Sequence, residues 1–353
     1  MIRDVPILSS EMVAAARSGD RLALARVLTQ VENSTPEGKA ALDALYPFTG
    51  GAHLIGITGS PGTGKSSLVN QLARALRKAD PSGRTRVAVV AIDPTSPFSG
   101  GAVLGDRVRM RDLVGDPGIF IRSMATRGAL GGLARATAEV TQVFDAAGYD
   151  FILIETVGAG QSEVDIARLA HTTIVVEAPG MGDDVQAIKA GILEIADILV
   201  VNKFDRPGAE GTMRILRSML ELSHPDEALY HHPHCPEPAV PLPVMPAASP
   251  ETDQPAWLPP VLATVATHGT GVSELLQSIR EHAEYLRLTG LWQQRQRDRL
   301  QADLSARIHD ALIDRWRGAL SEERFASIFA RLEERSLTPE RAAQLLIDRP
   351  SGN

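Results

Sequence analysis

The chain has 353 residues, of which 44% are hydrophobic and 22% are charged, and its net charge is -7 at pH 7. These values are typical of a globular protein with one large domain and extensions. The acidic balance and the lack of a long apolar run argue against nucleic-acid and membrane partners. A single cysteine, Cys235, permits no intrachain disulfide, and the first residues lack a signal-peptide core, so we expect a cytoplasmic protein.

The N-terminal segment, residues 1–48, is predicted to be helical. Two short amphipathic patterns are separated at Ser18-Gly19-Asp20, and a third short helix is expected over residues 38–45. We expect this helical segment to precede the main domain, which we assign to residues 49–288.

Within residues 49–288, short apolar runs alternate with amphipathic helical stretches. Runs of Val, Ile and Leu like these are typical of parallel strands that are buried on both faces. The predicted strands cover residues 54–58, 87–92, 119–122, 151–155, 173–177, 198–202 and 261–265. The sequence therefore predicts an α/β fold with a doubly wound, mostly parallel sheet, whose ligands bind at the carboxyl ends of the strands.

Residues 224–260 interrupt this pattern. They are rich in proline and histidine and are predicted to form a surface insertion without regular structure. Imidazole and thiolate are ligands for zinc and nickel, but the spacing of these histidines and Cys235 matches no defined metal motif. A solvated loop is therefore our preferred interpretation.

The C-terminal segment, residues 289–353, is charged and predicted to be helical. Apolar residues recur every four positions along one stripe, which must be buried either on its own domain or on a second copy of the chain. The stripe consists of Leu300, Leu304, Ile308, Leu312 and Trp316.

A phosphate-binding loop lies between the first predicted strand and a predicted helix. Its backbone N–H groups and the start of the helix would hold the phosphates of a nucleotide. Lys65 would reach the β- and γ-phosphates, and the Ser66 hydroxyl would bind Mg2+. The predicted nucleotide-binding residues here are Gly59, Ser60, Pro61, Gly62, Thr63, Gly64, Lys65, Ser66 and Ser67.

Acidic residues at the strand ends are candidate ligands of Mg2+ or of its water molecules. Asp93 ends the second predicted strand, and Asp106 lies on the glycine-rich loop that follows. The alternatives are that Asp93 starts a turn before a proline and that Asp106 caps a loop or a helix. Glu155 ends the fourth predicted strand, where GTPases usually have the aspartate of Asp-x-x-Gly.

Two further candidates follow Glu155. The N–H of Gly158 would meet the γ-phosphate, and Gln161 would position the attacking water, although a helix-capping or exposed role for Gln161 is an open alternative. The segment from Gly158 to Glu163 could order around the γ-phosphate and relax after hydrolysis.

The base is predicted to be guanine because Asn202-Lys203-Phe204-Asp205 follows the sixth predicted strand. The Asp205 carboxylate can accept hydrogen bonds from N1 and N2 of guanine, and adenine offers no such pair of donors. The backbone N–H groups of Val265 and Ala266 are expected to face the guanine carbonyl.

A second glycine-rich, acidic segment, residues 179–189, follows the fifth predicted strand. It is either a third mobile segment at the ligand edge of the sheet or an ordinary connection capped by Asp183 or Asp184.

The order of these motifs resembles the MeaB/ArgK/MMAA family, whose members are GTPase chaperones of adenosylcobalamin-dependent acyl-CoA mutases. The resemblance rests on residues 59–67, on Asp93-Pro94-Thr95-Ser96, on Glu155-Thr156-Val157-Gly158 with Gln161-Ser162-Glu163, and on Asn202-Lys203-x-Asp205. It extends over most of the chain. The insertion is longer than expected, and the sequence has no cobalamin-binding Asp-x-His-x-x-Gly, so the chain resembles the free-standing form and not the mutase fusion.

This resemblance implies a P-loop NTPase of the SIMIBI type that binds GTP or GDP with Mg2+. It also implies an acyl-CoA mutase as partner, a C-terminal arm that forms a homodimer, and slow hydrolysis that the partner stimulates. Residues Gly180 to Lys189 would correspond to an additional switch, in which Lys189 accelerates hydrolysis. The implied catalytic residues are Lys65, Glu155, Gln161 and Lys189, and the implied metal ligands are Ser66, Asp93, Asp106 and Glu155.

Two other functions are alternatives at this stage. A GTPase that delivers nickel during hydrogenase or urease maturation would share the fold and would use the His/Cys-rich insertion as a metal store. A kinase acting on an amino-acid transport protein would need ATP, and Asp205 argues against it.

Overall fold

The computed structural model describes residues 10–93, 110–113, 115–125, 132–156, 162–180, 194–223 and 256–347. The chain forms two compact units: unit 1 contains Met1–His234 and Ala248–Gln296, and unit 2 contains Cys235–Ala247 and Arg297–Asn353. The domain boundaries expected at residues 48 and 288 remain a proposal. None of the helices that the structure describes has the length and apolar character that a membrane crossing needs.

Unit 1 is built on a seven-stranded sheet in the order β3-β2-β4-β1-β5-β6-β7, in which every neighbouring pair is parallel. This confirms the predicted doubly wound α/β fold. The last strand is shorter than predicted, because Val265 leaves the ladder and forms an isolated antiparallel bridge with Thr270. The strands are β1 His53–Thr58, β2 Val87–Asp93, β3 Ile119–Ala125, β4 Phe151–Glu155, β5 Thr172–Glu177, β6 Ile198–Val201 and β7 Val261–Ala263.

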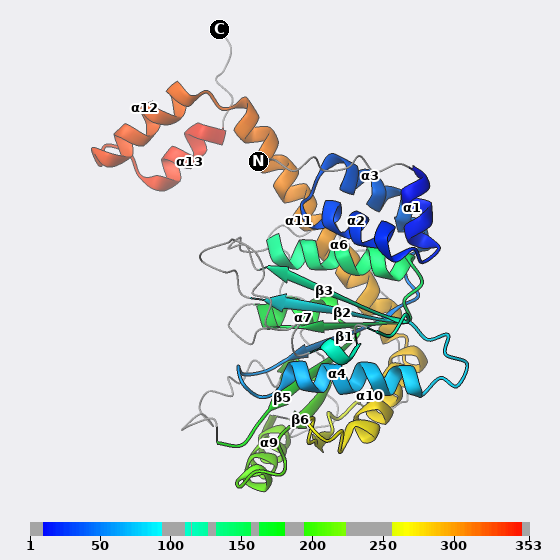
Figure 1. Cartoon of the computed structure of the whole chain (residues 1–353). Helices are drawn as coiled ribbons and strands as arrows, with labels where there is room; N and C mark the ends of the chain where they lie inside the picture. The colour runs from blue at the N-terminus through cyan, green and yellow to red at the C-terminus, as the bar shows by residue number, and fades with distance from the viewer. Residues whose placement is uncertain are drawn as a thin grey trace. The chain divides into compact units, whose positions relative to one another are not determined.

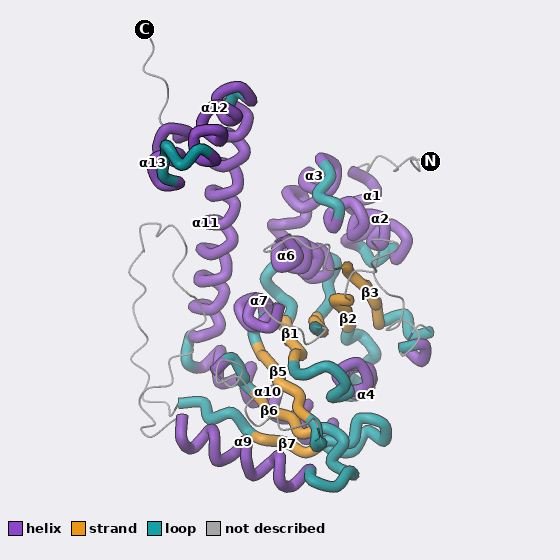
Figure 2. Tube along the Cα trace, turned by 90° about the vertical axis from the view of Figure 1, so that its left-hand side faces the viewer, coloured by secondary structure: helices purple, strands orange, loops and turns teal. Residues whose placement is uncertain are grey.

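Helices cover both faces of the sheet. Successive residues of a strand point to opposite faces, and so one face of β1 and β4 packs under α6 and α7, and the other under α4 and α10. Figure 2 shows α7 and α4 on opposite sides of β1. The helices that pack on the two faces of the sheet are α4 Lys65–Lys78, α6 Gly132–Ala146, α7 Ser162–Leu169, α9 Ala209–Ser223 and α10 Val272–Leu288.

The N-terminal helices are α1 Ser10–Arg17, α2 Arg21–Glu32 and α3 Pro36–Leu45, followed by a short 3-10 turn over Tyr46–Phe48. The predicted break at residues 18–20 is present, and the Asp20 side chain caps α2 by accepting from the Ala23 N–H at 2.8 Å. The third helix begins at Pro36, earlier than predicted, because Thr35 caps it and proline suits the first helical position. Helices α2 and α3 pack against α6, and α1 packs against α2 and α3 (Figure 1).

The amino ends of β1, β5 and β6 meet in a buried polar cluster. Thr172 Oγ1 lies 2.8 Å from His53 Nε2 and 2.9 Å from His282 Nδ1. The Asp197 carboxylate pairs with His282 at 3.2 Å and with Arg295 at 3.0 Å. Burial lowers the pKa of His53 to about 3, so its ring is neutral at pH 7.

This cluster holds the first turns of α11 Leu291–Ala319 on the sheet. Besides the Arg295 ion pair, the Trp292 ring stacks on the His171 ring with a centroid distance of 4.0 Å. The cluster contains groups from α10, α11, β1 and β5 and from the residue before β6, and so it fixes the point at which α11 begins.

Unit 2 contains the rest of α11 together with α12 Glu322–Glu333 and α13 Pro339–Ile347. The Trp316 indole donates to the Leu346 carbonyl at 3.0 Å, and Ser321 caps α12. The predicted apolar stripe lies on α11, and its aliphatic members are exposed, from 37% for Ile308 to 60% for Leu312.

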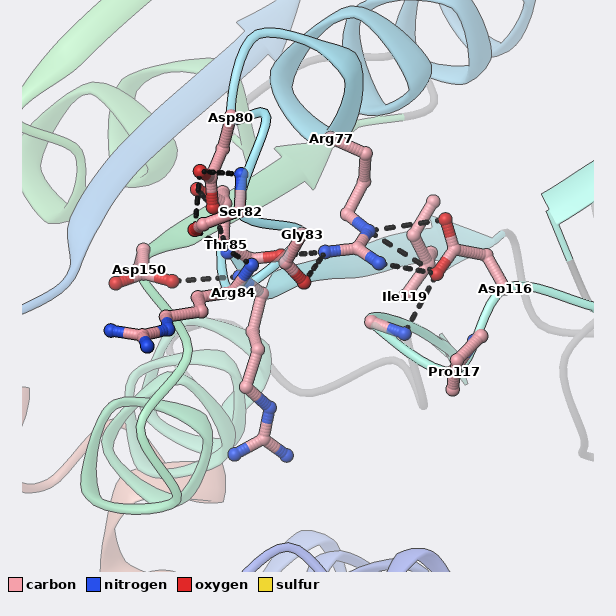
Figure 3. A network of polar contacts seen from close by, with 12 residues as sticks. Arg77, Asp80, Ser82, Gly83, Arg84, Thr85, Asp116, Pro117, Ile119 and Asp150 are labelled. Carbon is pink, nitrogen blue, oxygen red and sulfur yellow. Dashed lines mark hydrogen bonds and ion pairs between the residues drawn. The ribbon is translucent and has the colours of Figure 1, made fainter.

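A polar network near the amino ends of β2 and β3 is built around Arg77 of α4 (Figure 3). Its guanidinium donates to both oxygens of Asp116, at 2.9 to 3.2 Å, and to the carbonyls of Gly83 and Thr85. A Cβ on Gly118 would lie only 2.3 Å from Arg77 Cζ. The hydrogen bonds from Arg77 hold the pKa of Asp116 below its usual value.

We expect an Arg77→Met variant to be destabilised by about 1.5–3 kcal/mol at pH 7, because Asp116 and the carbonyls of Gly83 and Thr85 lose the charged donor that they share. The lowered pKa of Asp116 contributes stability above its unfolded pKa, and this contribution is lost as the pH falls through the folded pKa. The difference in unfolding free energy between wild type and variant should therefore shrink in acid. Urea denaturation at pH 7 and at acidic pH measures this difference, with Arg84→Met as a control. A difference that does not depend on pH would show that the Arg77 hydrogen bonds do not lower the pKa of Asp116.

Candidate functional site

The phosphate-binding loop connects β1 to α4, and two of its glycines are required by close approach. Gly59 has a φ of +133°, and a Cβ there would lie 2.0 Å from the carbonyl oxygen of Val176 on β5. Gly64 has a φ of +96°, and a Cβ there would lie 2.5 Å from Asn202 Nδ2. Any side chain at either position would push the loop away from the strands that hold it.

Lys65 begins α4 and folds back over the loop. Its Nζ donates to the carbonyl oxygens of Gly59 at 2.7 Å and Ser60 at 3.0 Å. The residue is buried, and these two hydrogen bonds hold its ammonium group against the phosphate loop, beside the first turn of α4. This combination favours an anion.

Ser66 and Glu155 form a pair of oxygen donors at the carboxyl end of the sheet. The Ser66 hydroxyl donates to Glu155 Oε1 at 2.6 Å, and both residues are buried. Parallel pairing of β1 with β4 places Glu155 beside Ile57, close to the start of the phosphate loop. A hydroxyl beside a carboxylate suits Mg2+, which prefers hard oxygen ligands.

The Asn202 carboxamide connects its own loop, after β6, to the phosphate loop and to the segment after β7. Its Nδ2 donates to the Thr63 carbonyl of the phosphate loop at 2.8 Å. Its Oδ1 accepts from Thr264 Oγ1 at 3.1 Å and from the Ala266 N–H at 3.0 Å, both in the segment after β7. The sequence indicated Asn202 as part of the base motif but gave no sign of Thr63 or Thr264 as its partners.

The remaining residues of the base motif line the same edge. Lys203 has a φ of +55°, and its Nζ donates to the Gly62 carbonyl at 2.6 Å. Asp205 is exposed in the turn after β6. The Val265 N–H donates to Thr270 at 3.0 Å, so this amide and that of Ala266 are hydrogen-bonded within the protein, and their base-contact roles remain predictions.

The structure thus brings together the phosphate loop, Glu155 and the base motif. The backbone of Asp93 lies at the end of β2, beside β4, whose Glu155 is in register with Ala91. The Asp93 side chain lies outside the described part of the structure. So do the other predicted site residues Asp106, Gly158, Gln161 and Lys189, and the histidines and Cys235 of the insertion.

Residues 24–321 match the family model described as "Methylmalonyl Co-A mutase-associated GTPase MeaB". The chain belongs to this family. It is therefore a GTPase-family protein with a P-loop fold of the SIMIBI type, as its sequence predicted.

Individual relatives agree with this assignment. A protein of Pyrococcus abyssi is 41% identical over 337 residues, which cover 96% of this chain and 95% of the relative. The methylmalonic aciduria type A homolog, mitochondrial, of Caenorhabditis elegans is 30% identical over 348 residues. These residues cover 94% of this chain and 80% of the relative. The crystal structure of an LAO/AO transport system kinase is similar with a TM-score of 0.66, at 25% identity and 98% coverage of both chains.

We expect Asn202→Asp to lower GTP affinity by about 10- to 100-fold, because an acceptor oxygen would face the Thr63 carbonyl and the loop would lose a buried hydrogen bond. Fluorescent-nucleotide titration measures the affinity. Asn33→Asp, which makes the same chemical change at an exposed C-cap, serves as the control. Equal affinities for the Asn202 variant and the wild type would show that the carboxamide does not hold the loop in its binding form.

Proposed function

We propose that this chain is a Mg2+-dependent GTPase that acts as chaperone of an adenosylcobalamin-dependent acyl-CoA mutase. GTP binding and hydrolysis would gate cofactor loading and the release of inactivated cofactor. The observation that carries the proposal is the match over residues 24–321 to a family named for its association with methylmalonyl-CoA mutase. The joining of the phosphate loop, Glu155 and Asn202 at one sheet edge supports it.

The phosphate end of the site would work mainly by positioning and electrostatics. The loop N–H groups and the start of α4 would hold the phosphates, and the Lys65 ammonium would exchange loop carbonyls for phosphate oxygens. Ser66 and Glu155, with Asp93 and Asp106, would hold Mg2+, which neutralises charge on the β- and γ-phosphates when bound. We propose Gln161 and Lys189 as the groups that orient water and accelerate hydrolysis.

The base end would select GTP. Asp205 would accept from N1 and N2 of guanine, and the Asn202 contacts hold the loop that carries it against the phosphate loop. An adenine base would leave this carboxylate without its donors, which disfavours ATP.

The described part of the chain does not support the nickel-delivery alternative, because it contains no group of three His, Cys, Asp or Glu residues able to hold a metal ion. The ligands that the sequence suggested for it, the histidines and Cys235 of the insertion, lie outside those residues.

We expect a cobalamin-dependent acyl-CoA mutase from the same organism to raise the rate of GTP hydrolysis by at least about tenfold, since partner groups that complete a GTPase site contribute up to about 10³–10⁵. A Lys189→Ala variant should lose this stimulation. Lys78→Ala, an exposed lysine of α4, should keep it. Phosphate release at saturating GTP measures the rates.

No stimulation by any such mutase would contradict the chaperone function. It would leave a GTPase of another client, and stoichiometric nickel binding to the same protein would then favour the metal-delivery alternative.

We also propose that the protein is a homodimer held by its C-terminal arm. The exposed apolar stripe of α11 supports this, because a helix that exposes aliphatic residues at every fourth position gains stability when a partner covers them.

A Leu304→Glu, Leu312→Glu double variant should sediment as a monomer of 37.8 kDa, whereas the wild type should sediment at about twice that mass. Ala306→Glu, placed on the other side of the helix, should remain a dimer. A wild-type monomer at micromolar concentration would contradict the proposal.

A further inference from the structure

Two buried threonines face each other where the nucleotide site begins. Thr58 is the last residue of β1 and precedes the phosphate loop, and Thr156 directly follows Glu155. The Thr156 hydroxyl donates to Thr58 Oγ1 at 3.0 Å, and the Thr156 N–H donates to the Ile57 carbonyl at 3.1 Å. Their exposures are 0% for Thr58 and 1% for Thr156.

The pair lies on the face of the sheet opposite to the Ser66–Glu155 contact. On β1, Ile57 packs in the core that contains α4, while Leu54 packs in the core that contains α7. Residues alternate along a strand, so Thr58 and Thr156 lie on the α7 side, and Glu155 reaches Ser66 on the α4 side. Figure 2 shows these two helices on opposite sides of β1.

Helix α7 closes this face tightly. A Cβ on Gly56, which shares the face with Thr58, would lie 2.6 Å from Ile166 Cγ2 and 3.1 Å from Ala170 Cβ. Within the described residues, the two hydroxyls are shielded from water and hydrogen-bond to each other, and a buried hydroxyl that loses its partner is costly.

The hydrogen bond joins the two strand ends at the residues from which the phosphate loop and Glu155 depart. We propose that Thr58 and Thr156 are positioning residues that hold Glu155 at hydrogen-bonding distance from Ser66 and thereby tune the affinity of the nucleotide site for Mg2+. This proposal rests on the proposed Mg2+-dependent GTPase function but requires no mutase.

A positioning role and a merely structural role make different predictions. A pair that only ties β1 to β4 would change the unfolding free energy and leave the Mg2+ dependence of nucleotide binding unaltered. A pair that positions Glu155 would change the Mg2+ dependence even in variants that remain folded.

The test measures the Mg2+ concentration that half-saturates GTP hydrolysis, and the Mg2+ dependence of GDP dissociation, for Thr156→Val. We expect both half-saturating concentrations to rise about three- to tenfold, as loss of one buried hydrogen bond implies. GDP affinity without Mg2+ should stay within about twofold, and Thr156→Ser, which keeps the hydroxyl, should restore the wild-type Mg2+ dependence.

Thr141→Val is the matched control. Thr141 is buried in α6, and its hydroxyl bonds to the Ala138 carbonyl at 2.8 Å. This variant should lose stability without a change in Mg2+ dependence.

If Thr156→Val does not fold, the double variant Thr58→Val, Thr156→Val removes both hydroxyls and leaves neither unpaired. This double variant should show the same rise in both half-saturating Mg2+ concentrations. An unchanged Mg2+ dependence in either folded variant overturns the proposal. GDP dissociation is measured without hydrolysis or mutase, so failure of the chaperone function would appear separately, as a wild type that no mutase stimulates.

Discussion

The site depends on one side chain, the carboxamide of Asn202. It spans a phosphate-loop carbonyl on one side and the segment after β7 on the other, with hydrogen bonds of 2.8 to 3.1 Å. These contacts are possible only because Gly64 has no side chain where Asn202 Nδ2 approaches. The Asn202 side chain thus ties the phosphate loop directly to the base motif and to the segment after β7.

The second constraint is the parallel direction of the strands, which places different functional groups at the two ends of the sheet. The carboxyl ends of β1, β4 and β6 carry the phosphate loop, Glu155 and Asn202. The amino ends of β1, β5 and β6 carry the cluster around Asp197 that fixes the start of α11. Burying the Asp197 carboxylate is tolerable because an arginine and a histidine both face it. The strands that hold the nucleotide site therefore also hold the beginning of the C-terminal helix.

Much of the fold could be predicted from the sequence because the strands are continuous Val/Ile/Leu runs and the helices have a clear apolar period. The phosphate loop and the base motif are local patterns with known geometry, and so they too were predictable. The boundary of β7 was not, because the bridge from Val265 to Thr270 depends on tertiary context. Contacts between residues far apart in the chain, such as His171 with Trp292, leave no trace in a single sequence.

The most direct test of the proposed chaperone function is the transfer of adenosylcobalamin to an apo acyl-CoA mutase, followed by its absorbance in the presence of this protein. Transfer should proceed with GTP and be arrested by a nonhydrolysable analogue, and this dependence on the nucleotide should disappear when the protein is omitted. Transfer at the same rate with either nucleotide, and with or without the protein, would show that the protein is not a chaperone of this mutase.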